Sequence, residues 1–149
     1  MKVIALFLLA SALVIHSPIS LAGEESAFHT SPDSDALEWS PCPEFFAEGC
    51  GIAVLNIDED GRNADVFFRY PAGESFVNHW HTSAERILVV RGTLEVTYEG
   101  QETATVQPGE YAFGPPAHKH HGACRSDEDC LLFIAFEDPP DTFEVAASE

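Results

Sequence analysis

From Cys50 onward, short apolar runs alternate with clusters of turn-forming residues, and the apolar positions show no helical period. In the clearest run Leu94, Val96 and Tyr98 alternate with polar residues, which is typical of a strand with one buried face. Glycine, proline and acidic residues end the runs. Strands are predicted at residues 52–57, 66–70, 86–91, 93–98, 103–106, 111–113 and 130–136. Many short strands between frequent turns indicate an all-β sandwich or barrel.

The pattern divides the chain into four parts. Residues 1–22 resemble a signal peptide, with a basic Lys2, an apolar run from Val3 to Ile15 and a small-residue cleavage site ending at Ala22. The alternative is a membrane anchor, but the run is shorter than the roughly 20 residues that cross a bilayer. We therefore expect a cleaved signal peptide and a periplasmic or secreted protein. A polar N-terminal arm (23–49), a single barrel domain (50–138) and a C-terminal tail (139–149) follow.

The charge is strongly acidic. Seven Lys and Arg stand against 25 Asp and Glu, for a formal net charge of −18. Such a surface repels nucleic acid and anionic lipid head groups, so we expect neither nucleic acid nor a membrane as partner. Sixteen aromatic residues (11 Phe, 2 Trp and 3 Tyr) exclude an acidic disordered protein.

The four cysteines are expected to form disulfides, because an exported chain with an even number of cysteines at short spacings commonly does so. Cys42 with Cys50 and Cys124 with Cys130 would each close a small loop, and this is the economical pairing. Three pairings remain possible from the sequence. Metal binding by the cysteines is the alternative, although neither pair has the short spacing typical of zinc sites.

Histidines carry the candidate chemistry. His79 and His81 stand two apart, so on a strand both side chains point to one face and can converge on an ion. Glu85 follows after a short stretch that can turn back towards them. A second cluster near residue 120 offers a fourth ligand, from either His118 or His120. Imidazole and carboxylate together favour Fe, Mn, Zn, Ni or Cu as the divalent metal, and not calcium.

The spacing around these residues resembles the cupin superfamily. Gly73-x5-His79-x-His81-x3-Glu85-x6-Gly92 agrees with the first cupin motif at every fixed position. The run from His79 to Arg86, together with the later cysteines, is most similar to the ChrR-like cupins.

The second cupin motif is matched less fully. Gly109, Pro115 and His120 fall in register, whereas Ala117 replaces a glycine and Cys124 replaces an asparagine. The resemblance implies a double-stranded β-helix, the cupin jelly-roll barrel, with one metal ion on His79, His81, Glu85 and His120. His118 remains the alternative to His120.

The resemblance to cupins implies several candidate functions. A metal-dependent enzyme, most plausibly a dioxygenase-like oxidoreductase acting on a small organic molecule, is the first expectation. The alternatives are a non-catalytic cupin that binds a small ligand or the metal itself, and a cupin isomerase or sugar-modifying enzyme. Many cupins form homodimers, so a homodimer is possible here. No residue of the sequence is identified as a general base.

Overall fold

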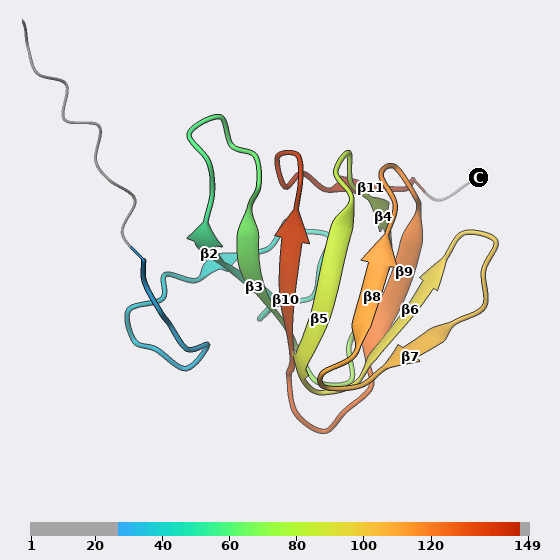
Figure 1. The fold of residues 1–149 in the computed structure, drawn as a ribbon. Helices are drawn as coiled ribbons and strands as arrows, with labels where there is room; N and C mark the ends of the chain where they lie inside the picture. Colours follow the sequence, from blue (N-terminus) through green and yellow to red (C-terminus); the bar gives the residue numbers. More distant parts are fainter. Residues whose placement is uncertain (1–26, 147–149) are drawn as a thin grey trace, which may run out of the picture.

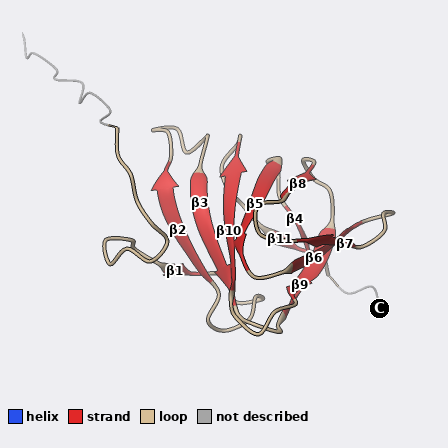
Figure 2. Ribbon diagram, turned by 60° about the horizontal axis from the view of Figure 1, so that its bottom comes forward, coloured by secondary structure: helices blue, strands red, loops and turns tan. Residues whose placement is uncertain are grey.

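The computed structural model describes residues 27–146, in which β-strands are the regular secondary structure and no α-helix occurs (Figures 1 and 2). The strands are β1 (Ser40–Pro41), β2 (Gly51–Asn56), β3 (Asp65–Tyr70), β4 (Ser75–Trp80), β5 (Glu85–Arg91), β6 (Leu94–Tyr98), β7 (Ala104–Val106), β8 (Tyr111–Gly114), β9 (His120–Cys124), β10 (Cys130–Phe136) and β11 (Phe143–Glu144). The predicted signal peptide lies outside the described residues. Residues 27–146 include no helix of the length and hydropathy needed to span a membrane.

The strands form two antiparallel sheets. The six-stranded sheet has the order β1-β2-β3-β10-β5-β8, and the five-stranded sheet has the order β11-β4-β9-β6-β7. Sequence neighbours such as β3 and β4 lie in different sheets, whereas β10 returns between β3 and β5 (Figure 1). Such crossing between two sheets is the jelly-roll arrangement, and the all-β prediction is confirmed.

The core lies between the two sheets. Val66, Ile87 and Ile134 from the six-stranded sheet pack with Leu94 and Val96 from the five-stranded sheet. In β6 the burial alternates residue by residue, as the apolar pattern predicted, because Leu94, Val96 and Tyr98 face inward. For β6 the sequence thus predicted both the strand and the face that is buried.

All seven strands predicted from the sequence are present, within one or two residues at each end. Four further strands, β1, β4, β9 and β11, were not delimited in advance. β4 contains Ser75 and Asn78, and β9 contains Gly122, so neither strand shows a continuous apolar alternation. These two strands are nevertheless neighbours in the sheet, and they carry two of the candidate ligands.

Both disulfides follow the economical pairing, Cys42 with Cys50 and Cys124 with Cys130. The first ties the end of the N-terminal arm to the start of β2, where Ser40 also pairs with Ile52. The second joins the end of β9 to the start of β10, and thereby links the two sheets.

Candidate metal centre

The pairing of β4 with β9 places two histidines side by side. His79 lies near the end of β4, directly opposite His120 at the start of β9. Opposed residues of antiparallel strands point to the same face, with Cβ atoms about 4.5–5.5 Å apart. His81 follows two residues after His79, so it returns to that face. The ring centroids of His79 and His120 are 4.1 Å apart, and those of His79 and His81 are 5.0 Å apart.

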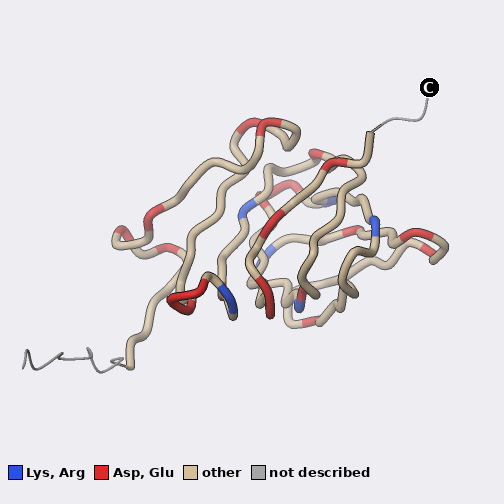
Figure 3. The backbone as a smooth tube through the Cα atoms, turned by 90° about the horizontal axis from the view of Figure 1, so that it is seen from above, with Lys and Arg blue, Asp and Glu red and all other residues tan. Residues whose placement is uncertain are grey.

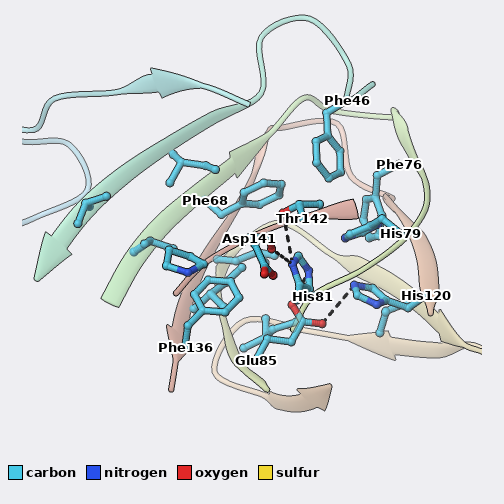
Figure 4. A pocket seen from close by; sticks show the side chains of 18 of the residues that line it. Phe46, Phe68, Phe76, His79, His81, Glu85, His120, Phe136, Asp141 and Thr142 are labelled. Carbon is cyan, nitrogen blue, oxygen red and sulfur yellow. Dashed lines mark hydrogen bonds and ion pairs between the residues drawn. The ribbon is translucent and has the colours of Figure 1, made fainter. Parts of the chain in front are cut away.

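The three imidazoles form a compact buried cluster. One ring nitrogen of each of His79, His81 and His120 lies within 4.8 Å of those of the other two. All three side chains are buried, and they point into a shared cavity (Figure 4). Within the described residues this is the group of ligand-type side chains whose geometry suits a metal ion.

The tautomer of each ring follows from its hydrogen bonds. The Nδ1 of His79 lies 2.9 Å from the Val77 carbonyl oxygen, and that of His120 lies 3.0 Å from the His118 carbonyl oxygen. The Nδ1 of His81 lies 2.5 Å from the carbonyl oxygen of Asp141. A carbonyl oxygen only accepts, so each Nδ1 carries the proton and donates it. The three Nε2 atoms are therefore left with free lone pairs, which is the state in which histidine binds metals.

Burial favours the neutral form of two of the rings, His79 and His120. Desolvation is the main cause that lowers the pKa of His79, to about 3, and the neighbouring His120 lowers it further. Burial also lowers the pKa of His120, although Glu85 opposes that shift. Neutral imidazoles need no deprotonation before they bind a cation, so proton competition at neutral pH is weak.

Glu85, the first residue of β5, lies beside two of the three histidines. Its Oε1 lies 3.2 Å from the Nε2 of His120, and its Oε2 lies 3.6 Å from the Nε2 of His81. With each Nδ1 protonated, these contacts bring carboxylate oxygens against bare imidazole lone pairs in a buried site. Two acceptors repel one another unless a proton or a cation lies between them. A divalent cation held by the three histidines would relieve this repulsion, so the residues fit a metal.

A tyrosine orients the Glu85 side chain, and a glycine on the neighbouring strand leaves space for it. The hydroxyl of Tyr98 donates to Oε1 of Glu85 at 3.0 Å. Burial and the adjacent carboxylate raise the pKa of Tyr98 above its usual range, so the hydroxyl stays protonated. Gly114 pairs with Glu85 across the sheet, and a Cβ at that position would lie 2.5 Å from Oε1. The sequence analysis did not identify either residue as part of the site.

His118 lies outside the cluster. Its Nε2 is 3.1 Å from the carbonyl oxygen of Glu99, and the residue is half-buried. The structure thus brings His120, and not the alternative His118, to the other candidate ligands. Ala117 adopts a φ of +56°, a conformation that glycine adopts without strain and alanine does not. That left-handed residue stands where the second cupin motif has a glycine.

The N-terminal arm and the C-terminal tail both reach the cluster, which the sequence did not predict. The ring of Phe46 lies edge-on to that of His79, with centroids 5.2 Å apart. In the tail, Asp141 accepts from His81 through its carbonyl and from the Thr82 amide through its carboxylate. Neither position has an apolar period or a motif to mark it, because each is fixed by contacts between residues far apart in sequence.

A cavity of about 280 Å³ opens beside the histidines. It extends between the two sheets, and its walls come from strands of both sheets together with Phe46 and Asp141 of the flanking segments (Figure 4). The four candidate ligands His79, His81, Glu85 and His120 all line it. A molecule in this cavity could therefore contact an ion bound at the cluster.

A jelly roll with three histidines and a glutamate converging at one end of its interior defines the cupin class. Residues 29–138 match the family of ChrR cupin-like domains, so this chain belongs to that family. The prediction of a ChrR-like cupin is confirmed. No curated protein matches the chain in sequence.

Solved structures share the fold. The DMSP lyase DddQ from Ruegeria pomeroyi DSS-3 is 19% identical, with a TM-score of 0.61 over 72% of this chain and 60% of its own. KdgF from Halomonas sp. is 18% identical, with a TM-score of 0.56 over 67% of this chain and 87% of its own. Oxalate decarboxylase from Bacillus subtilis, described with Mn(II) centres, is 19% identical, with a TM-score of 0.58 over 66% of this chain and 29% of its own. The chain thus spans three-fifths of the length of DddQ, and these similarities establish the fold alone.

Proposed function

We propose that this protein is a metal-dependent cupin enzyme that acts on a small organic molecule, with His79, His81, Glu85 and His120 as its metal ligands. One observation carries the proposal. Three buried imidazoles, each with its Nδ1 proton donated to a carbonyl, have ring nitrogens within 4.8 Å of one another, and two of the rings lie against a buried carboxylate. In the absence of a cation this arrangement is repulsive, and with one it is favourable.

The lining of the cavity favours chemistry supplied by the metal. Its titratable side chains are the four proposed ligands and Asp141. The carboxylate of Asp141 already accepts hydrogen bonds from the amide and the hydroxyl of Thr82. Among the described residues, the lining therefore offers no carboxylate or imidazole that is free of both the proposed ion and an internal hydrogen bond. Dioxygenase-like oxidation fits this lining better than an isomerisation, which needs a base to move a proton.

A bound transition metal would supply Lewis acidity and, if it is redox-active, oxygen chemistry. The protein would contribute positioning and exclusion of water. The ion would be held by His79, His81 and His120, and the apolar walls would hold the substrate beside it. Glu85 is the group best placed to accept a proton, should its carboxylate leave the ion.

The lack of such a free base also supports a second candidate function, in which the protein is not a catalyst. A cupin that only binds a small ligand needs the cavity and the ion, but no group that transfers protons. The two functions differ in a measurable way, because only an enzyme converts its ligand.

Oxygen consumption separates the two functions. The metal-free protein is reconstituted under anaerobic conditions with Fe(II), Mn(II), Ni(II), Cu(II) or Zn(II), and oxygen uptake is followed with diketones, phenols and aromatic diols. We expect uptake with one redox-active metal and its loss in a His120→Ala variant. Stoichiometric metal binding without turnover of any compound would contradict the oxidative function and favour the binding role.

Two disulfides are typical of proteins that fold outside the cytoplasm. We propose that residues 1–22 are a cleaved signal peptide and that the mature protein is periplasmic or secreted. Zinc and copper bind such ligands more tightly than iron does, so the metal acquired there depends on supply as well as on geometry. The partition into arm, barrel and tail, and the homodimer, likewise stay predictions.

A further inference from the structure

The walls of the cavity are apolar over most of their extent. Aliphatic and aromatic side chains from both sheets face it, among them Ile52, Val66, Phe68, Ile87, Val96 and Ile134. Beyond the three histidines and Glu85, the polar side chains of the lining are two hydroxyls, of Ser40 and Thr142, and the carboxylate of Asp141. A ligand that fills the cavity therefore contacts hydrocarbon along most of its surface.

Lysine and arginine side chains are missing from this lining, and those of the described residues are engaged elsewhere. Residues 27–146 contain six Lys and Arg, and none of them lines the cavity. Five form ion pairs near the surface: Arg62–Asp138, Arg86–Glu137, Arg91–Asp33, Lys119–Glu99 and Arg125–Glu95. The sixth, Arg69, lies over the ring of Trp39 at 4.6 Å. No Lys or Arg of the described residues thus remains to neutralise a charge at the end of a ligand that points away from the histidines.

The surroundings add to this bias against anions. Asp141 places a carboxylate in the lining, beside the backbone carbonyl that accepts from His81. Acidic residues are distributed over many loops, whereas basic residues are few (Figure 3). The formal net charge of −18 gives an approaching anion an unfavourable potential. An ionised group left unpaired against apolar walls is strongly disfavoured.

The volume of the cavity and its aromatic side chains further restrict the class of ligand that it can bind. Its volume of about 280 Å³ lies near the lower end of the range for small-molecule sites, about 300–1,000 Å³. Phe46, Phe68, Phe76 and Phe136 all face it (Figure 4). Aromatic side chains pack edge-on or offset against a ligand ring at centroid distances of about 4.5–7 Å. A compact ring or a branched hydrocarbon suits these walls.

We propose that the ligand is a small, predominantly apolar molecule that presents one oxygen-containing group to the histidine cluster and carries no charge at its far end. This inference rests on the proposed metal site, because the ion is what would receive that oxygen. Dicarboxylates, phosphate esters and sugar acids are excluded by the same reasoning, since the walls offer no cation and few hydrogen-bond donors.

Two phenols of similar shape test the charge at the far end. 4-Methylphenol and 4-hydroxybenzoate share the phenolic oxygen and differ by a methyl group or a carboxylate at the opposite position. Binding to the zinc-loaded protein is measured by calorimetry, with glucose as a polar control. We expect 4-methylphenol to bind about tenfold more tightly or better, because the distal carboxylate would be desolvated without a partner.

A positive charge introduced at the rim of the cavity tests the same inference, and a positive charge placed outside the cavity is the matched control. Val54 lines the cavity and is 52% exposed, whereas Val90 is 38% exposed on β5 and does not line it. Val54→Lys should tighten 4-hydroxybenzoate binding by roughly two- to fivefold, the range of a partly exposed ion pair, and Val90→Lys should leave it unchanged. Both positions are at the surface, so both variants are expected to fold.

The outcomes separate this inference from the metal proposal. Loss of zinc binding altogether would overturn the metal site itself. Zinc retained, with 4-hydroxybenzoate or glucose binding as tightly as 4-methylphenol, would overturn the apolar-ligand inference alone. Zinc retained with no saturable binding of either phenol would also contradict it.

Discussion

Tyr98→Phe removes one hydroxyl and leaves the ring in place. That hydroxyl donates to Oε1 of Glu85 at 3.0 Å, in a position where both side chains are buried. A hydrogen bond to a charged group contributes about 1.5–3 kcal/mol, so the metal-free protein should lose roughly that much unfolding free energy. Groups that orient a metal ligand in this way typically change metal affinity by about 10- to 100-fold. We expect Tyr98→Phe to weaken zinc binding within that range.

The assay is competition with a chromophoric chelator, together with urea denaturation of the metal-free protein. Tyr70→Phe is the matched control, because Tyr70 is also buried and its hydroxyl donates to the Ser75 carbonyl and accepts from the Ala47 amide. That variant should lose stability and keep its zinc affinity. Wild-type affinity in Tyr98→Phe, or an equal loss of affinity in Tyr70→Phe, would refute the role assigned to the hydroxyl.

Three further predictions concern stability, each measured by urea denaturation. His79 has a folded-state pKa of about 3, against an ordinary value of 6.5, so the unfolded chain binds its proton more tightly. The metal-free protein should therefore lose up to about 5 kcal/mol as pH falls from 6.5 to 3, and His79→Gln should show a smaller loss. Ala117→Gly should stabilise by about 0.5–1 kcal/mol, because it relieves a φ of +56°, whereas Ala112→Gly on β8 should not stabilise. Replacing Cys124 and Cys130 together by serine should cost about 2–3 kcal/mol, and an unchanged midpoint would contradict a constraining role for that disulfide.

The sequence predicted the seven strands that carry apolar runs between turn residues, because these signals are local. In β6 the alternation of Leu94, Val96 and Tyr98 with polar residues predicts which face is buried. The spacing of His79 and His81 likewise predicted two side chains on one face, because that depends only on the pleat of a strand. Features that follow from a few neighbouring residues were therefore accessible.

Features that depend on contacts between residues far apart in the chain could not be predicted from the sequence. The choice between His118 and His120 needed the cupin motif, and the geometry behind it is the register of β9 against β4. The hydrogen bond from His81 to Asp141 joins residues 60 apart in the chain. Phe46 reaches His79 from an arm whose composition is polar. Such contacts are decided by the packing of whole sheets, which no local pattern records.

The most direct test of the account is the metal content of three proteins, the wild type, His118→Ala and His120→Ala. Each is loaded with excess zinc, dialysed at neutral pH and measured by elemental analysis. The account predicts about one zinc per chain in the wild type and in His118→Ala, and a substoichiometric amount in His120→Ala, since His120 would be one of only four protein ligands. Full occupancy in His120→Ala, or loss of zinc in His118→Ala, would contradict the proposed centre.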